Sequence, residues 1–234
     1  MAQVQRVSAD WNAPVIVAAS GPSLTKDVAW EARKARWFGP WRIVAVSDAW
    51  RLLPLADILY SCDAEWWNVH EGVPAFRGEK WSSQGDDKEK NDDKYDVADK
   101  YGLKLVRGRQ GVGFSTNPDL IHYGSNSGFQ AVNLAVLKGA TKIVLVGFDM
   151  REVEGKRHFF GDHPAGLRNH GEYRNFIRAF EQATPPVPII NATPGSALKC
   201  FPMMDLRDAL ADLRDGDRPL AYPTTSRDCT TQGV

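Results

Sequence analysis

The chain has 234 residues, enough for one domain with a continuous hydrophobic core. Lysine plus arginine and aspartate plus glutamate both number 29, so bulk electrostatics predict no general nucleic-acid binding. The three cysteines show no CxxC or zinc-ligand spacing, which favours a reducing compartment. No apolar run approaches about 18 residues, and Met1 to Asp10 are polar, so we expect a cytoplasmic protein without a membrane span.

Short apolar runs alternate with helical patterns along the chain, which predicts a parallel sheet with crossover helices. The expected strands cover residues 15–19, 42–46, 58–61, 103–107, 142–146 and 187–191. The expected helices cover residues 24–36, 48–53, 65–69, 128–138, 172–182 and 205–213. Strands that are almost wholly apolar are typical of a sheet covered on both faces. We therefore predict a single α/β, Rossmann-like domain over residues 1–214.

Three segments interrupt this alternation. Residues 84–100 are rich in acidic side chains and lysine and are expected to form an acidic insertion loop. Residues 151–169 form a long loop directly after the strand 142–146, at the end of the sheet where open α/β folds bind ligands. Residues 215–234 are polar and are expected to form a C-terminal tail.

Two strand-to-helix junctions have the composition of anion-binding sites. In the first, an apolar run ends at Ser20, Gly21 permits close backbone approach, and Ser23 is a good helix N-cap. In the second, Asn126 and Ser127 open the helix that precedes the strand 142–146. Helix N-termini favour anions because their first N–H groups are unpaired and the macrodipole is positive there. Two such junctions in one domain predict a transferase site for an activated nucleotide.

Five motifs occur in this order along the chain: ASGPSL, VSDAW, ADILYSCDAEWW, NSGFQAVNLAVLKGATKIVLVGFDM and NATPGSAL. Over most of the chain they resemble one superfamily. It comprises bacterial CMP-sialic-acid sialyltransferases, the motility accessory factors that glycosylate flagellin, and archaeal 6-hydroxymethylpterin diphosphokinases. The resemblance implies one Rossmann-type domain that transfers a group from a nucleotide donor.

The resemblance also implies a donor site. Its residues are Ser20, Gly21, Ser23, Ser47, Asp48, Asn126, Ser127, Gly128 and Asp149. In the family, the positions of Ser47 and Asp48 contact the ribose or base, and those of residues 126–128 lie against the donor phosphate and sugar. Ser20 stands where the sialyltransferases have an asparagine that contacts the nucleotide, so the resemblance does not fix CMP as the donor.

The loop of residues 158–164 resembles the catalytic loop of the sialyltransferases. His163 aligns with the histidine that acts as general base on the acceptor hydroxyl, and His158 aligns with the first histidine of that loop. A histidine suits this role because its pKa lies near neutral pH. Asp162 is additional to the family pattern.

Several residues are candidates for binding the leaving phosphate. The family's phosphate-binding tyrosines have two candidate counterparts, Tyr123 and Tyr173. Arg151, Arg157 and Arg168 are able to pair with phosphate, and the sequence does not choose among them.

The sequence leaves other functions open. In the diphosphokinase branch, Asp63 and Asp149 would hold Mg²⁺ at strand ends and the substrate would be ATP, whereas the sialyltransferase branch implies no metal. A third hypothesis is a non-catalytic protein that binds a nucleotide or a partner. The acceptor hydroxyl is unassigned, the family implies a homo-oligomer, and the compact chain fits a phage or mobile-element protein acting in the host cytoplasm.

Overall fold

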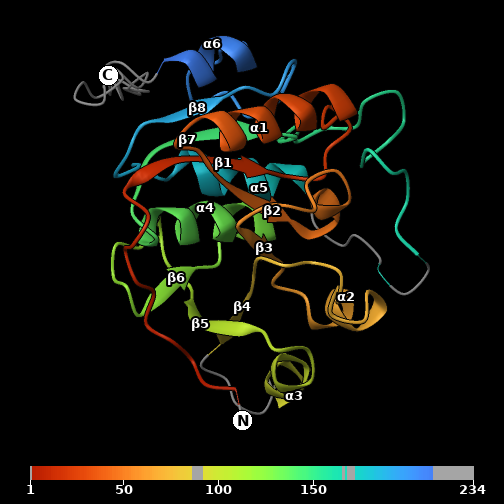
Figure 1. Cartoon of the computed structure of the whole chain (residues 1–234), viewed down its shortest axis with the longest axis vertical. Helices are drawn as coiled ribbons and strands as arrows, with labels where there is room; N and C mark the ends of the chain where they lie inside the picture. The colour runs from red at the N-terminus through yellow and green to blue at the C-terminus, as the bar shows by residue number, and fades with distance from the viewer. Residues whose placement is uncertain (1, 86–91, 165–166, 168–171, 213–234) are drawn as a thin grey trace, which may run out of the picture.

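The computed structural model describes residues 2–85, 92–164, 167 and 172–212 (Figure 1). Among these residues, eight parallel strands form one sheet in the order β6-β5-β4-β3-β2-β1-β7-β8. The strands are β1 (Ala13–Ala18), β2 (Arg42–Val46), β3 (Ile58–Tyr60), β4 (Glu79–Gly85), β5 (Lys104–Arg109), β6 (Leu120–His122), β7 (Ala140–Val146) and β8 (Ile189–Asn191).

Helices cover both faces of this sheet. The helical elements are α1 (Lys26–Phe38), η1 (Ser47–Arg51, a 3₁₀-helix), α2 (Ala64–Val69), α3 (Asp92–Tyr101), α4 (Ser127–Leu137), α5 (Tyr173–Glu181) and α6 (Leu206–Ala211). One hydrophobic cluster packs the sheet against α1, α2, α3 and α6, and a second packs it against α4 and α5. The predicted α/β architecture is therefore confirmed.

Strand β1 illustrates how the sequence builds the two layers. All of its residues are buried, and they alternate between the faces: Ile16 joins the cluster under α1, whereas Val15 and Val17 join the cluster under α4. Helix α1 begins after Thr25, whose hydroxyl accepts a hydrogen bond from the Val28 N–H.

The order of the strands creates a topological switch point beside β1. From β1 the chain proceeds outward through β2 to β6, and α4 then returns it to β7 on the other side of β1. Helices α1 and α4 pack on opposite faces of the sheet. A crevice at the carboxyl ends of β1 and β7 is the expected consequence, and open α/β sheets bind ligands there.

The acidic segment 84–100 contains the end of a strand and a helix. It was expected to be a loop, but β4 continues to Gly85 and α3 begins at Asp92, while residues 86–91 lie outside the described part. Strand β4 was not predicted, because its buried residues Ser82, Ser83 and Gln84 are polar and do not form an apolar run. The Ser83 hydroxyl donates to the Gln130 side chain of α4 at 2.8 Å, which satisfies it in the core.

Two further elements differ from those predicted. The strand β6 was not predicted, and the helix expected at 48–53 is the 3₁₀-helix η1. The long connection after β7 is present, whereas the tail 215–234 lies outside the described residues. Every helix in the described part of the chain is too short or too polar to span a lipid bilayer.

Candidate functional site

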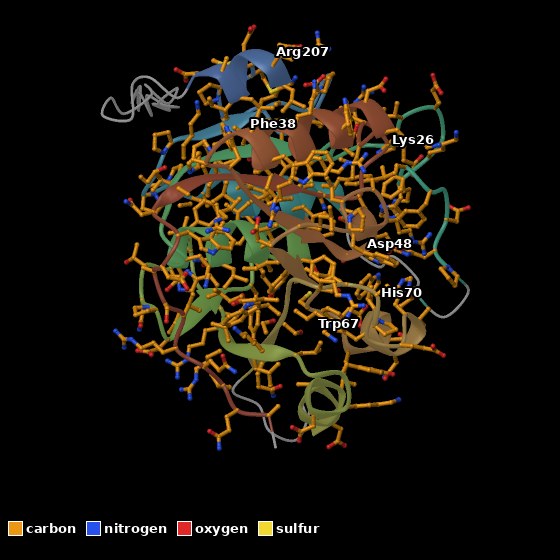
Figure 2. The ribbon with its side chains drawn as sticks, viewed as in Figure 1. Lys26, Phe38, Asp48, Trp67, His70 and Arg207 are labelled. Carbon is orange, nitrogen blue, oxygen red and sulfur yellow. The ribbon has the colours of Figure 1, made fainter. Side chains whose placement is uncertain are left out.

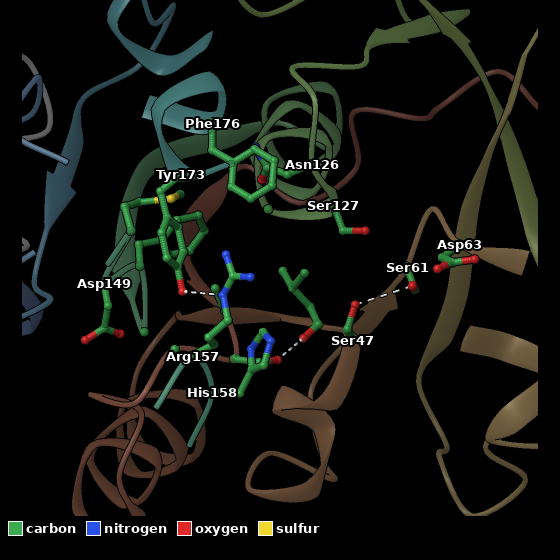
Figure 3. Close-up of a pocket in the computed structure, with 18 of the residues that line it drawn as sticks. Ser47, Ser61, Asp63, Asn126, Ser127, Asp149, Arg157, His158, Tyr173 and Phe176 are labelled. Atoms are coloured by element: carbon green, nitrogen blue, oxygen red, sulfur yellow. Dashed lines mark hydrogen bonds between the residues drawn. The ribbon is translucent and has the colours of Figure 1, made fainter. Parts of the chain in front are cut away.

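A cavity of about 400 Å³ lies at the switch point, where β1, β2, β3 and β7 end and α4 begins (Figure 3). Most of the predicted site residues line it: Ser20, Gly21, Ser47, Asp63, Asn126, Ser127, Gly128, Asp149, His158 and His163. Segments far apart in the sequence therefore meet at one cavity. Ser23 and Asp48 are absent from its wall.

The first junction is held together by its own hydrogen bonds. The Ser23 hydroxyl donates to Asp149 at 2.8 Å, and the Ser23 N–H lies 3.3 Å from both carboxylate oxygens. Asp149 is only 2% exposed, and burial raises its pKa despite the opposing hydrogen bonds from Ser23. A Cβ at Gly21 would lie 2.1 Å from Asp149 Oδ2, so glycine is required for this packing. Ser23 thus holds the carboxylate of Asp149, which lines the cavity, in a fixed position.

The second junction presents a capped helix N-terminus to the cavity. The Asn126 side chain accepts from the Phe129 N–H at 2.8 Å and donates to the Gly124 carbonyl oxygen at 3.0 Å. The Ser127 hydroxyl lies 3.0 Å from Cys62 Sγ. Because the first N–H groups of a helix lack partners within it, this end of α4 suits an anionic ligand.

Asp48 lies in the interior directly behind the cavity wall, because it contacts Trp66, which lines the cavity. It is 1% exposed, its Oδ2 accepts a 2.8 Å hydrogen bond from Trp66 Nε1, and the Arg51 guanidinium lies 2.8 Å from its Oδ1. His70 is beside it, with Nε2 3.5 Å from Oδ1 (Figure 2). The Asp48 carboxylate therefore does not line the cavity, and the expected ribose contact stays a prediction. Its neighbour Ser47 lines the cavity and donates to Ser61 Oγ at 3.3 Å (Figure 3).

The two loop histidines form one packed cluster at the cavity. Their ring centroids lie 4.5 Å apart, and the His158 ring stacks on Phe160 at 5.0 Å with an interplanar angle of 4°. The Phe159 N–H donates to the Ser20 carbonyl oxygen at 3.1 Å, which ties this loop to the end of β1. The loop, the first junction and the second junction therefore converge.

Burial sets the protonation of both histidines. It lowers the pKa of His158 to about 4, and the neighbouring His163 and Arg157 act in the same direction. Burial also lowers the pKa of His163, although the Asp48 carboxylate opposes the shift. Both rings are consequently neutral at pH 7, the form in which an imidazole accepts a proton.

Arg157 and Tyr173, two of the candidates for binding the leaving phosphate, both line the cavity. The Arg157 Nε donates to Tyr173 Oη at 3.4 Å, and the guanidinium carbon lies 4.8 Å from the tyrosine ring centroid (Figure 3). Arg151 also lines the cavity and donates to the Gly195 carbonyl oxygen at 2.8 Å. Tyr123 packs against Gly108 and lies outside the cavity wall. The fold therefore brings Arg151, Arg157 and Tyr173 to the cavity and leaves Tyr123 outside it. Arg168 lies outside the described residues.

The two aspartates proposed for Mg²⁺ do not converge. Asp63 accepts from the Glu65 N–H at 2.9 Å and thereby caps α2, while Asp149 is engaged by Ser23. They lie on opposite sides of the cavity (Figure 3). Within the described residues, no group of three or more His, Cys, Asp or Glu side chains is arranged to hold a metal ion. These aspartates therefore do not fit a shared magnesium site.

No protein-family model matches the chain, and no curated protein matches it.

Proposed function

We propose that this protein is a transferase that moves a sugar from a nucleotide-activated donor to a hydroxyl acceptor. In the reaction, the bond between the anomeric carbon and the donor phosphate breaks, and a bond from that carbon to the acceptor oxygen forms. His163 takes the acceptor proton, and the nucleotide leaves with the electron pair of the broken bond. The proposal agrees with the family resemblance of the sequence.

One observation carries the proposal: His163 shares a single cavity with the N-terminus of α4 and with Arg157. A group transfer from a nucleotide needs a general base and a site for the leaving phosphate within reach of the same substrate. The lowered pKa of His163 keeps it unprotonated at neutral pH, as a base must be. Arg157 and the helix N-terminus supply the positive potential that a leaving phosphate requires.

The remaining lining residues fit the parts of such a substrate. Ser20 and Ser47 lie at the ends of adjacent strands, where hydroxyl groups suit the ribose or base. Tyr173, beside Arg157, is placed to donate a hydrogen bond to a phosphate oxygen. His158 contacts His163 and Ser20, so its neutral ring would orient the base and not replace it.

Nucleotide binding separates the proposal from its alternatives. We expect CMP or another nucleoside mono- or diphosphate to raise the melting temperature without metal, whereas an ATP-dependent pyrophosphoryl transferase would respond to ATP with Mg²⁺. Binding of a nucleotide without turnover across a panel of activated sugars would favour the non-catalytic hypothesis.

A substitution then tests the base. His163→Gln should abolish turnover while nucleotide binding persists, since the base acts only on the acceptor. The exposed Lys156, in the same loop but outside the cavity wall, provides the control: Lys156→Gln should retain turnover. Full turnover by His163→Gln would overturn the catalytic assignment. Native mass spectrometry would establish whether the protein is the homo-oligomer that the resemblance implies.

A further inference from the structure

A continuous set of contacts joins the buried Asp48 carboxylate to the two loop histidines. The Arg51 guanidinium lies 2.8 Å from Asp48 Oδ1, and its central carbon lies 5.1 Å from the ring centroid of Phe160. Phe160 stacks on His158 at 5.0 Å and contacts His163 edge-to-face at 5.1 Å. Arg51 thus bridges the turn after β2 and the loop after β7.

We propose that Arg51 is a positioning residue that holds His158 and His163 over the cavity by binding the face of Phe160. This inference rests on the proposed function, in which His163 is the base. Arg51 itself is absent from the cavity wall, so it acts on the reaction through its contact with Phe160 and through its charge near His163.

The chemistry of arginine explains the choice of residue. A planar guanidinium binds a carboxylate with its N–H groups and an aromatic ring with its face, whereas a lysine ammonium cannot present both surfaces. Asp48 is fixed by the Trp66 indole N–H at 2.8 Å and is 1% exposed, so Arg51 has a rigid anchor. Because a buried carboxylate needs a countercharge, removing Arg51 should also weaken the site around Asp48.

The position of Arg51 in the chain links the loop to the cavity floor. Arg51 ends η1, the short 3₁₀-helix that begins with the cavity residue Ser47. One turn of five residues therefore presents a hydroxyl to the cavity and a guanidinium to the histidine loop. A change at Arg51 should disturb the loop more than the nucleotide site, because the α4 N-terminus and the end of β1 belong to other elements.

The charged groups around His163 influence its pKa. The charged and titratable groups acting on His163 are Asp48, Arg51, Asp63 and Asp162, with His70 and His158 beside them. The Arg51 charge lowers the pKa of His163, whereas Asp48 raises it. Removing the Arg51 charge leaves the Asp48 carboxylate uncompensated, so the pKa of His163 should rise. A lysine at position 51 keeps the charge and should leave this pKa nearly unchanged.

Three variants test the role of Arg51, with one matched control. Arg51→Met removes the charge and the stacking, Arg51→Lys removes the stacking alone, and Phe160→Leu removes the ring while leaving the Asp48 ion pair. Arg33→Met is the control, because Arg33 stacks on Trp30 at 5.5 Å on α1, outside the cavity wall. We expect all three test variants to lower kcat about tenfold or more, with nucleotide affinity within about twofold of wild type.

Histidine titration by NMR supplies the readout that a purely structural role would not move. The pKa of His163 should rise in Arg51→Met and stay near the wild-type value in Arg51→Lys and Arg33→Met. Unchanged kcat in Phe160→Leu, or an unchanged His163 pKa in Arg51→Met, would overturn the proposal. If the wild-type protein has no turnover, the proposed function is wrong. The titrations, with hydrogen exchange of residues 158–163, then decide separately whether Arg51 holds the loop.

Discussion

The Ser23 hydroxyl donates a hydrogen bond to the Asp149 carboxylate across 2.8 Å, although 126 residues separate the two in the sequence. The bond joins the turn after β1 to the end of β7, the two strands that flank the switch point. The sequence predicted that both residues belong to the binding site of the nucleotide donor. In the structure they contact each other, so the floor beneath the cavity is fixed before any ligand binds. A preorganised floor of this kind reduces the ordering cost of binding.

This pair should contribute measurably to stability. Ser23→Ala removes the 2.8 Å bond and leaves a buried carboxylate oxygen without that donor, so we expect a loss of about 1.5–3 kcal/mol in the free energy of unfolding. Urea denaturation of Ser23→Ala, Asp149→Asn and the double variant measures the coupling between the two side chains. Strictly additive effects of the two substitutions would contradict a direct interaction.

Gly21 should tolerate no side chain. A Cβ there would lie 2.1 Å from Asp149 Oδ2 and 2.4 Å from the Gly147 carbonyl oxygen. Asp149 is fixed by Ser23 and cannot withdraw cheaply, so Gly21→Ala should cost about 3 kcal/mol and weaken nucleotide binding. The comparison is Gly102→Ala, where φ is +66° but no atom lies within 4 Å of the new Cβ. It should cost about 1–2 kcal/mol and leave binding intact.

An equal loss of stability in the two glycine variants, with equal nucleotide affinity, would show that the close packing at Gly21 has no special role. Thermal denaturation and nucleotide titration of both proteins provide the measurement.

His158 should make the protein sensitive to acid. Its folded-state pKa of about 4 lies below the ordinary value of 6.5, so the folded state binds this proton more weakly than the unfolded chain. The stability from His158 is fully present above pH 6.5 and is lost as the pH falls through about 4. His158→Gln should therefore lose less stability than wild type between these two pH values in urea denaturation. A His158 NMR titration with a midpoint near 6.5 would refute the prediction.

The architecture was predictable where hydrophobicity alone determined it. Strands β1, β2 and β7 are apolar runs buried on both faces, and helix α4 opens with the N-cap Asn126. Strand β4 was not predictable in this way, because Ser83 is buried against Gln130, a partner that only the tertiary structure supplies. The local sequence pattern predicts a strand whose residues are apolar. It does not predict a strand whose buried polar side chains form hydrogen bonds with residues distant in the sequence.

The same distinction applies to the site. Ser20, Asn126 and His163 follow strands or open a helix, so sequence reasoning placed them at the carboxyl edge of the sheet, and they line the cavity. Asp48 also follows a strand, but it turns inward to Trp66 and Arg51. Nothing in the local sequence distinguishes an aspartate that faces a ligand from one that anchors the interior, because the difference lies in partners from other turns and helices.

Arg157 should contribute strongly to nucleotide affinity. Its guanidinium stacks on Tyr173 at 4.8 Å and lines the cavity near the N-terminus of α4, so it is placed to bind a phosphate with charge-assisted hydrogen bonds. Such bonds contribute about 1.5–3 kcal/mol each, so Arg157→Met should weaken binding of a nucleoside phosphate about 10- to 100-fold. The corresponding nucleoside without phosphate should lose little affinity.

Arg174→Met is the control, since Arg174 is exposed and pairs with Glu172 at 3.4 Å. Isothermal titration of both ligands to both variants measures the difference. Equal weakening of nucleoside and nucleotide in Arg157→Met would mean that Arg157 shapes the cavity without binding the phosphate.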